Sequence, residues 1–292
     1  MNPIMDATQW VGPLVLFLLM VAVGLELAPA DFRRIMKAPL AVTVGTLGQI
    51  VLLPLLTWGI VALLDVPPIF AAGAIIVAVS PGAGISNILV ASAGANVALS
   101  VTLTAFASVL CVVTLPTIAA LGMRYFLGEA VDIEVPVVHL MVQLSLTLLF
   151  PIGVGMYWRA SRPEFVGRHR ERLQRGALVA IVVLMVLGSL FSDSSDFTIG
   201  DAGAGMLAAL LWTVLAMAIG WGLAAAIGLP SADRFTFLIE FSTRNIGVAA
   251  IVAMSGLGRL DLALYIGAYM TIAYPLAATF VVLRRRRGGF AR

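Results

Sequence analysis

A group of side chains able to bind ions or move protons lies inside one of the apolar stretches of the sequence. Residues 240–247 read Glu-Phe-Ser-Thr-Arg-Asn-Ile-Gly, which places a carboxylate, a guanidinium, two hydroxyls and an amide side by side. Apolar arms at 235–239 and 248–254 flank this run, and together they are long enough to cross a bilayer. An ionisable side chain at membrane depth costs about 2.5 kcal/mol or more, so such residues usually pair, bind an ion or line a cavity. This polar run is therefore the first candidate for the working site.

A second apolar stretch is interrupted in a similar way. Residues 80–87 read Ser-Pro-Gly-Ala-Gly-Ile-Ser-Asn, and proline and glycine interrupt helices. In the next apolar stretch, Ser100 and Thr104 stand four residues apart and hence on one helical face. Their hydroxyls suit a hard cation, which prefers oxygen ligands. Alternatively, the two hydroxyls bond carbonyls of their own helix.

The composition indicates a membrane protein. Hydrophobic residues make up 61% of the 292 residues, charged residues only 11%, and the mean hydropathy is +1.06. An ordinary soluble domain carries about 25% charged residues, so the sequence predicts an all-α polytopic membrane protein. A single cysteine, Cys111, excludes an internal disulfide framework and a thiolate metal cluster. The basic pI of about 9.4 follows from the loop charges described next and does not indicate nucleic acid.

Nine apolar stretches are expected to cross the membrane, and the third and eighth are the interrupted ones. Their expected ranges are 10–30, 40–64, 69–92, 97–123, 137–158, 176–191, 203–228, 235–257 and 262–283. Of the 18 Lys and Arg residues, all but Arg124, Arg244 and Arg259 fall in the loops of one side or in the C-terminal tail. By the positive-inside rule, the C-terminus is cytoplasmic and the N-terminus is outside, in the inner or plasma membrane of the cell.

The two interrupted stretches occupy matching places in two units of opposite orientation. Each is followed by one further long stretch and then by the end of its unit. This pattern predicts a secondary transporter built from inverted repeats, with four helices in residues 1–134 and five in 135–292. In such folds the ends of broken helices meet near the midplane of the membrane, where they suit a cation and an anionic substrate together.

Three stretches resemble the bile acid:sodium symporter family. They are GLELAPADF at 24–32, SPGAGISN at 80–87 followed by GANVALSVTLT at 94–104, and IEFSTRNIG at 239–247. The resemblance implies core and panel domains, two broken helices that cross, and uptake of a small organic anion with sodium by alternating access. It also implies the nine-helix form, without the family's optional first helix. Its expected partners are the organic anion and the lipid bilayer, with no enzyme activity, no cofactor other than the coupling sodium, no nucleic acid and no obligate protein partner.

The same resemblance implies residues for ions and substrate. The first sodium site would consist of Ser86, Asn87, Ser100, Thr104 and Glu240. The second would consist of Gln49, Glu240, the backbone oxygens of Phe241 and Thr243, and a glutamine whose place is taken here by Arg244. The substrate would contact Gly84, where close family members carry a hydroxyl residue, together with Arg244 and Asn245.

Arg244 departs from the family pattern, and three interpretations stay open. Its guanidinium replaces the second sodium ion as a tethered cation close to Glu240, grips the substrate carboxylate in bidentate fashion, or only neutralises Glu240 in an inactive carrier. Gln49 is either a sodium ligand or an interhelical hydrogen-bonding residue. Proton coupling through Glu240 and a sodium-independent carrier are the alternatives within transport. An intramembrane hydrolase using Ser86 and His139 is disfavoured, because His139 lies near the outer boundary and no nucleophile elbow surrounds the serine.

Overall fold

The computed structural model describes most of the chain, and the described part is helical. It covers residues 14, 17–18, 20–25, 27, 38–64, 66–127, 136–169, 172–173, 176, 179, 183, 199–257, 259 and 261–290. Five helical segments in this part are long and apolar enough to cross a membrane: Pro39–Leu64, Val97–Tyr125, Val137–Ser161, Ala202–Ala226 and Ala263–Arg286. The protein is therefore an integral membrane protein, as the composition predicts.

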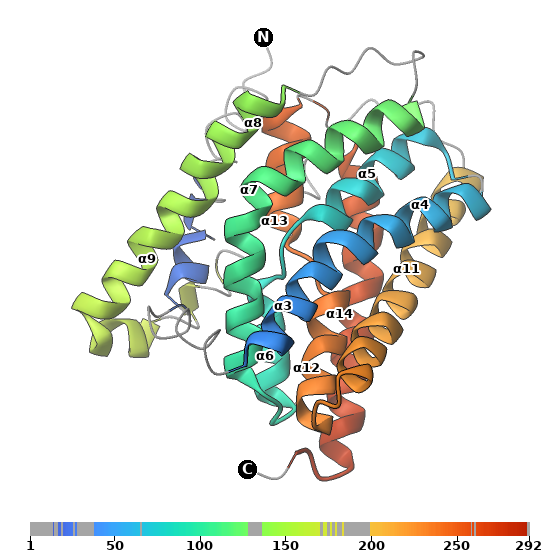
Figure 1. Cartoon of the computed structure of the whole chain (residues 1–292). Helices are drawn as coiled ribbons and strands as arrows, with labels where there is room; N and C mark the ends of the chain where they lie inside the picture. Colours follow the sequence, from blue (N-terminus) through green and yellow to red (C-terminus); the bar gives the residue numbers. More distant parts are fainter. Residues whose placement is uncertain are drawn as a thin grey trace.

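Figure 1 shows the helices of the described residues. In chain order they are α3 (Pro39–Leu47), η2 (Gly48–Leu52), α4 (Leu53–Leu64), α5 (Pro68–Val79), α6 (Gly84–Ser92), α7 (Val97–Leu127), α8 (Val137–Leu144), η4 (Ser145–Leu149), α9 (Phe150–Ser161), α11 (Ile199–Ala226), α12 (Ser231–Ser242), α13 (Ile246–Ala250), η5 (Ile251–Gly256) and α14 (Ala263–Arg286). The expected first and sixth spans, 10–30 and 176–191, lie mostly outside the described residues.

Both interrupted stretches are broken helices. The third expected span divides into α5 and α6, and the eighth divides into α12 and α13. The first break is shorter than the sequence suggests, because α6 already begins at Gly84, after the proline and first glycine of the run. The second break comprises only residues 243–245. Each span therefore consists of two half-helices joined by a few unwound residues.

The two breaks lie against each other in the middle of the molecule. Gly82 and Arg244 form an antiparallel β-bridge. On either side of it, the Ala83 N–H donates to the Thr243 carbonyl at 3.1 Å and the Asn245 N–H donates to the Pro81 carbonyl at 2.9 Å. In Figure 1 the half-helices α5 and α13 lie above this crossing, and α6 and α12 lie below it. Unwound backbone is tolerated at membrane depth because each break supplies hydrogen-bonding partners to the other.

Two of the straight spans contain short π-helical segments just before a proline. Pro54 follows η2 and Pro151 follows η4, each at the second position of the next helix. A proline has no N–H for the carbonyl four residues earlier, and a π-helical turn adjusts the preceding hydrogen bonds. The segment η2 also carries Gln49, whose side chain is fully buried. The local irregularity of the helix thus coincides with a candidate site residue.

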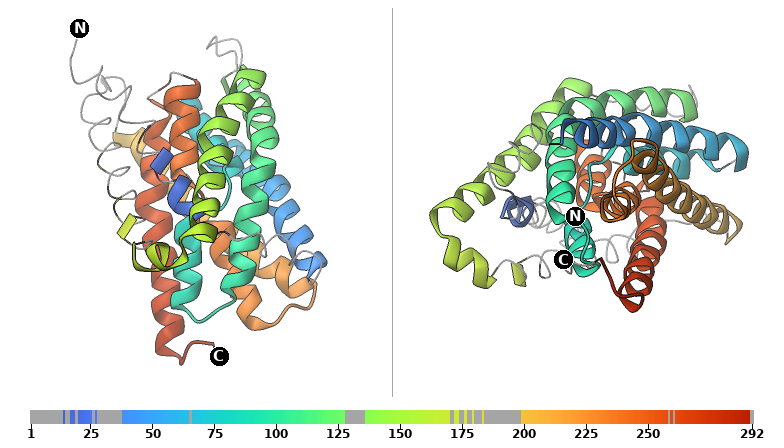
Figure 2. Two further views of the ribbon diagram at one scale, coloured as in Figure 1. Left: turned by 90° about the vertical axis from the view of Figure 1, so that its left-hand side faces the viewer. Right: turned by 60° about the horizontal axis from the view of Figure 1, so that its bottom comes forward.

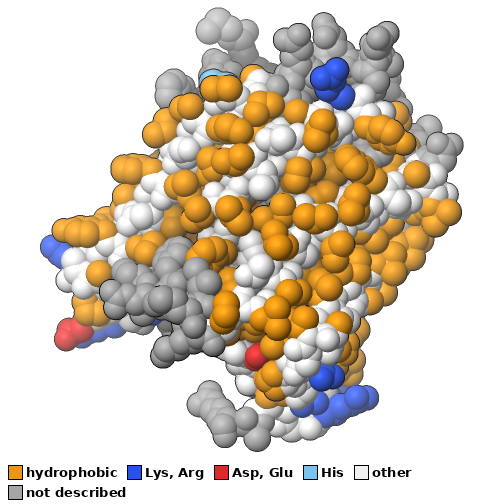
Figure 3. Space-filling model, in the orientation of Figure 1, with side chains coloured by type: hydrophobic (Ala, Val, Ile, Leu, Met, Phe, Trp, Pro, Cys, Tyr) orange, Lys and Arg blue, Asp and Glu red, His pale blue; other side chains and the backbone are white. Residues whose placement is uncertain are grey.

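The broken helices are enclosed by the straight ones. Helix α12 packs on α11, and α5 packs between α7, α4 and α14. Figure 2 shows α8 and α9 at one side of this bundle. Hydrophobic side chains cover the middle of the face in Figure 3, with Lys and Arg toward its ends. Outward-facing residues such as Leu63 and Val138, which are 80% and 73% exposed, are consistent with contact to lipid.

Candidate functional site

The carboxylate of Glu240 lies at the centre of a cluster of polar side chains from α6, α7 and α12. Thr104 Oγ1 donates to Oε2 of this carboxylate at 3.0 Å, and the hydroxyls of Ser86 and Ser100 contact its Oε1. Ser100 Oγ also lies 2.7 Å from Asn87 Oδ1. All of these side chains are buried, the most exposed being Asn87 at 4%. The structure therefore brings together the whole set that the resemblance implies for the first ion.

The atoms that face one another in this cluster are oxygens. Ser86 Oγ lies 2.7 Å from the Ala83 carbonyl in addition to its contact with Glu240. The hydroxyls of Ser86, Ser100 and Thr104 supply one proton each. They face the two carboxylate oxygens, Asn87 Oδ1 and the Ala83 carbonyl, and this carbonyl also accepts from the Ser86 N–H at 2.9 Å. A buried cluster lined by such oxygens is suited to a hard cation or to an additional proton.

Ser100 and Thr104 do not behave as ordinary hydroxyl residues in apolar helices. Thr57 and Thr213, for example, bond carbonyls four residues earlier in their own helices, at 2.9 and 2.7 Å. The hydroxyls of Ser100 and Thr104 instead reach Glu240 on another helix. The alternative in which these two residues only satisfy their own helix is therefore wrong for this structure.

A glycine permits the close approach of the first break to this carboxylate. A Cβ atom at Gly82 would lie 2.6 Å from Oε2 of Glu240 and 3.0 Å from Oγ1 of Thr104. The first distance is too short for any side chain, and Glu240 is enclosed on every side. The glycine is therefore needed to bring the unwound backbone next to the carboxylate.

The guanidinium of Arg244 occupies a cage of neutral oxygens near Glu240. Its Nη1 donates to Gln49 Oε1 at 2.6 Å and lies 3.4 Å from the backbone carbonyl of Glu240, and its Nη2 contacts the Ser80 carbonyl. Ser80 caps the C-terminus of α5, and Glu240 lies in the last turn of α12. Helix C-termini carry partial negative charge, which favours a cation at this position.

Among the described residues, no carboxylate pairs directly with this guanidinium. The one ion pair within 4.0 Å in this part of the chain joins Arg259 to Asp261, between η5 and α14. The side chain of Arg244 is only 2% exposed. A buried charge of this kind needs a full set of hydrogen-bond acceptors or an opposite charge. The cage supplies acceptors for both terminal nitrogens, and the opposite charge on Glu240 lies beyond direct contact.

Three buried polar atoms of this region have no hydrogen-bond partner among the described residues. They are Arg244 Nε, Gln49 Nε2 and Thr46 Oγ1, and the last two belong to neighbouring turns of the same span. Buried polar atoms are almost always paired with protein, water or a ligand. Gln49 forms the interhelical hydrogen bond that one interpretation predicts, while its amide N–H group stays available.

The other residues implied by the resemblance have local partners. Asn245 Oδ1 accepts from the N–H groups of Gly247 and Val248 at 3.1 and 3.2 Å, and so caps α13. The backbone oxygen of Thr243 accepts from Ala83, as described above. The aromatic ring of Phe241 is buried and stacks on Phe237, with 5.7 Å between the ring centroids. The capping role of Asn245 was missed by the sequence analysis, although asparagine before a helix is a recognised signal.

Gly84 begins α6 without any side-chain cap. The residue before it, Ala83, offers no side-chain acceptor, and Gly84 itself is partly exposed. The N-terminus of α6 therefore differs from that of α13, which Asn245 caps. Free N–H groups at a helix N-terminus favour an anion.

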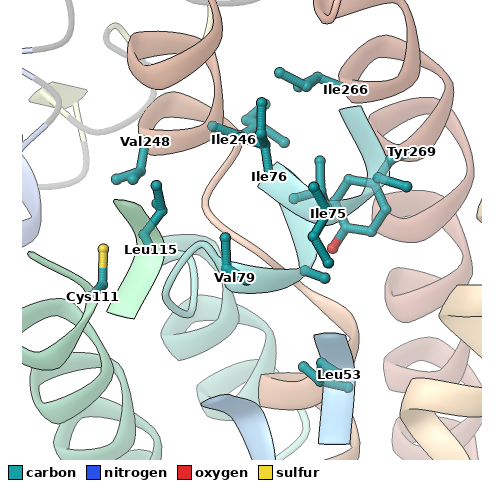
Figure 4. Close-up of a cluster of buried hydrophobic side chains, with 14 of the residues drawn as sticks. Leu53, Ile75, Ile76, Val79, Cys111, Leu115, Ile246, Val248, Ile266 and Tyr269 are labelled. Atoms are coloured by element: carbon teal, nitrogen blue, oxygen red, sulfur yellow. The ribbon is translucent and has the colours of Figure 1, made fainter. Parts of the chain in front are cut away.

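Two tyrosines of α14 also contact the second break, and the sequence analysis did not identify them. Tyr269 and Tyr274 bond the backbone of residues 242 and 244. Figure 4 shows Tyr269 beside Ile75 of α5 in the apolar core next to the crossing. The available signal was weak, because a tyrosine in an apolar span is also common at membrane interfaces.

The sequence matches a known protein family. Residues 13–195 match the model of the Sodium Bile acid symporter family, which is more than half of the chain. The protein belongs to this family. The matched stretch contains the candidate residues on η2, α6 and α7, and it ends before Glu240 and Arg244 on the second broken span. The resemblance inferred from the sequence motifs is confirmed.

Curated relatives are similar at low identity. The uncharacterized sodium-dependent transporter YocS of Bacillus subtilis is 24% identical over 236 residues, which are 81% of this chain and 71% of YocS. The probable sodium/metabolite cotransporter BASS2, chloroplastic, of Oryza sativa subsp. japonica is 27% identical, over 80% of this chain and 54% of the relative. The P3 protein of Homo sapiens is 25% identical, over 78% and 47%. The alignments thus span about half the length of the rice and human relatives.

Proposed function

We propose that this protein is a secondary transporter that carries a small organic anion together with sodium by alternating access. The observation that carries the proposal is the buried oxygen cluster around Glu240, beside the crossing of two broken helices. Membership of the Sodium Bile acid symporter family and two relatives named as sodium-dependent or sodium-coupled support it. The protein's role is transport rather than catalysis.

The sodium ion is bound by the Glu240 cluster. Its ligands are Glu240 and the side-chain oxygens of Ser86, Asn87, Ser100 and Thr104. These groups already lie in mutual contact and are buried, which limits competition from water. Sodium is a hard cation without a requirement for nitrogen or sulfur ligands. Among the described residues, no group of three or more His, Cys, Asp or Glu side chains offers a site typical of a transition metal.

Arg244 serves as a fixed cation in place of a second mobile ion. The support is its position in an oxygen cage built by Gln49, the end of α5 and the last turn of α12. In the empty carrier the charges of Glu240 and Arg244 sum to zero. In the loaded carrier one sodium ion and one monovalent anion also sum to zero. Both forms are therefore neutral when they reorient in the membrane, which avoids the cost of moving a net charge through it.

The carboxylate of the substrate binds next to this crossing. Its contacts are the uncapped N-terminus of α6 at Gly84, the amide nitrogen of Asn245 and the side of Arg244 that carries the unpartnered Nε. The N–H group of Gln49 Nε2 is a further available donor. This arrangement keeps open the interpretation in which Arg244 grips the substrate directly. The effect of replacing Arg244 distinguishes the two interpretations, as developed in the Discussion.

The remaining architecture follows from the same proposal. Residues 1–134 and 135–292 form inverted repeats of four and five helices, and α8 and α9 belong to the panel that rocks against the core containing the crossing. The position of α8 and α9 beside the bundle in Figure 2 supports this division. The N-terminus is outside and the C-terminus is in the cytoplasm of a cell whose inner or plasma membrane holds the protein. Proton coupling through Glu240 is the competing function, because the same cluster suits a proton.

The test is uptake and ion stabilisation measured on the purified protein. Thermal unfolding is followed in detergent with sodium, potassium or choline chloride at equal ionic strength, and accumulation of radiolabelled organic acids is followed in proteoliposomes. We expect sodium to raise the unfolding temperature and to drive accumulation. We expect Glu240→Gln, which removes the formal charge of the cluster, to abolish both effects. Accumulation driven by a pH gradient in potassium would support proton coupling instead, and a full sodium response in Glu240→Gln would exclude this site.

A further inference from the structure

The break between α12 and α13 leaves backbone groups at membrane depth that no helix can satisfy. The Thr243 carbonyl accepts from the Ala83 N–H, and the Asn245 N–H donates to the Pro81 carbonyl, so two of these groups are bonded by the other break. The Thr243 N–H still bonds Ile239, and the Asn245 carbonyl already accepts from Ala249. Within residues 242–245, the groups left over are the Ser242 carbonyl and both backbone groups of Arg244.

Tyr269 satisfies two of these three groups with one hydroxyl. Its oxygen donates to the Ser242 carbonyl at 2.5 Å and accepts from the Arg244 N–H at 2.6 Å. The ring is fully buried, and Trp212 meets it edge to face with 5.6 Å between the ring centroids. Figure 4 shows the hydroxyl end of this ring pointing away from α14 toward the neighbouring elements. Packing thus fixes the direction from which the hydroxyl reaches the break.

Tyr274 satisfies the third group. Its hydroxyl donates to the Arg244 carbonyl at 2.9 Å. The ring lies 6.3 Å from that of Tyr269, nearly perpendicular to it, with an interplanar angle of 74°. Side chains of α14, a helix of 24 residues, therefore bond both the N–H group and the carbonyl of Arg244. In the described structure, each backbone N–H and carbonyl from Thr243 to Asn245 has a partner.

We propose that Tyr269 and Tyr274, here called the tyrosine clasp, are positioning residues that set where the Arg244 guanidinium lies. From the backbone orientation in this structure, the side chain of Arg244 reaches Gln49 and the Ser80 carbonyl. The other break holds residues 243 and 245, and α14 holds both the N–H group and the carbonyl of Arg244 itself, so α14 contributes directly to this orientation. The clasp therefore couples the position of α14 to the charge at the crossing. Its consequence for ion binding rests on the proposed function, whereas its effect on the backbone does not.

The backbone effect is tested by hydrogen exchange. Tyr269→Phe removes the hydroxyl and keeps the ring, and Tyr265→Phe makes the same change one turn earlier on α14. Tyr265 is also buried, and its hydroxyl bonds none of the described residues of the break. We expect the Arg244 amide to exchange about tenfold faster or more in Tyr269→Phe and at the parent rate in Tyr265→Phe. Equal exchange in the two variants would overturn the clasp. If Tyr269→Phe does not fold, Tyr274→Phe, which frees the Arg244 carbonyl and keeps the ring, is measured in its place. Exchange is then read at the Asn245 amide, which shares a peptide group with that carbonyl.

The role in ion binding is tested by sodium titration of the same proteins. We expect Tyr269→Phe to raise the sodium concentration for half-maximal stabilisation about fivefold or more, because a guanidinium released from its cage can move toward the Glu240 carboxylate and compete with sodium. In an Arg244→Gln background, the same change is expected to have less than about twofold effect, because no guanidinium remains to be positioned. Equal effects in the two backgrounds would show that the tyrosine is merely structural. Lack of any sodium response in the parent protein would reject the proposed function, while hydrogen exchange would still decide the clasp.

Discussion

Replacing Arg244 with glutamine tests the charge arrangement of the whole site. The substitution removes one positive charge from a position where the side chain is 2% exposed and three oxygens accept its hydrogen bonds. Glutamine keeps an N–H donor for this cage, so the main change is electrical. The empty carrier would then hold the single negative charge of Glu240. A carrier loaded with one sodium ion and one monovalent anion would be negative as well.

The size of the expected effect follows from the membrane potential. One elementary charge that crosses 100 mV corresponds to about 2.3 kcal/mol, or about a 40-fold change in an equilibrium ratio. The parent protein moves no net charge if Arg244 is the fixed cation, so its uptake is expected to change less than about twofold between 0 and −100 mV. In Arg244→Gln, a second sodium ion takes the vacated cage. Accumulation then becomes voltage-dependent by up to the full factor, and the Hill coefficient for sodium rises above one.

The assay is uptake into proteoliposomes with a potassium diffusion potential set by valinomycin. Arg244→Lys is the matched control, because it keeps the charge and loses the planar fork. It is expected to stay insensitive to voltage. If Arg244 instead grips the substrate carboxylate, Arg244→Gln loses substrate affinity at every sodium concentration, and Arg244→Lys is impaired as well. Cooperative sodium dependence in the parent protein, together with current carried by a monovalent substrate, would refute the fixed-cation argument.

Three further predictions concern the residues around Glu240 and the topology of the chain. Thr104→Ala is expected to weaken sodium stabilisation roughly tenfold while Thr104→Ser keeps it, since only the first removes the hydroxyl that bonds Glu240; equal loss in both variants would count against the hydroxyl as a ligand. Gly82→Ala is expected to abolish uptake because its Cβ would lie 2.6 Å from the Glu240 carboxylate, whereas Gly222→Ala, with nothing within 4 Å, keeps it; uptake that survives in Gly82→Ala contradicts the close approach. In a cysteine-free background, a cysteine at Asp196 is expected to react with an impermeant reagent from outside and one at Arg170 is not, and the opposite pattern would reverse the topology.

The class of the protein was predictable from the composition, and the residues around Glu240 were implied by the resemblance of three stretches to the family. Apolar stretches of membrane-spanning length can be read directly from the sequence, and a carboxylate inside one of them usually pairs with a charge, binds an ion or lines a cavity. The spacing of Ser100 and Thr104 places both hydroxyls on one face of α7, which is the face that meets Glu240. These features depend on local periodicity and on a motif, which a single sequence displays.

The surroundings of Arg244 were not predictable in detail. Glu240 and Arg244 are four residues apart, and in an unbroken helix this spacing favours a direct ion pair. The helix ends at Ser242, so the backbone turns and the guanidinium binds the Glu240 carbonyl, Gln49 and Ser80 instead. The tyrosine clasp was missed for the same reason. It depends on how α14 packs against the break and on which backbone N–H and carbonyl groups the break leaves without helical partners. Both are set by the tertiary structure, and residue spacing along the sequence does not indicate them.

The pairing of the two breaks has a consequence for how the protein is made. Residues 81–83 depend on residues 243–245 for hydrogen bonds, and these partners are synthesised much later. Until the eighth span is inserted, the backbone of the third span has no such partner in the chain, and unpaired backbone groups are costly in hydrocarbon. The third span therefore reaches its final form only near the end of translation. A truncation that removes the eighth span is expected to leave the third as a distorted or displaced segment, which places assembly of the ion site among the last steps of folding.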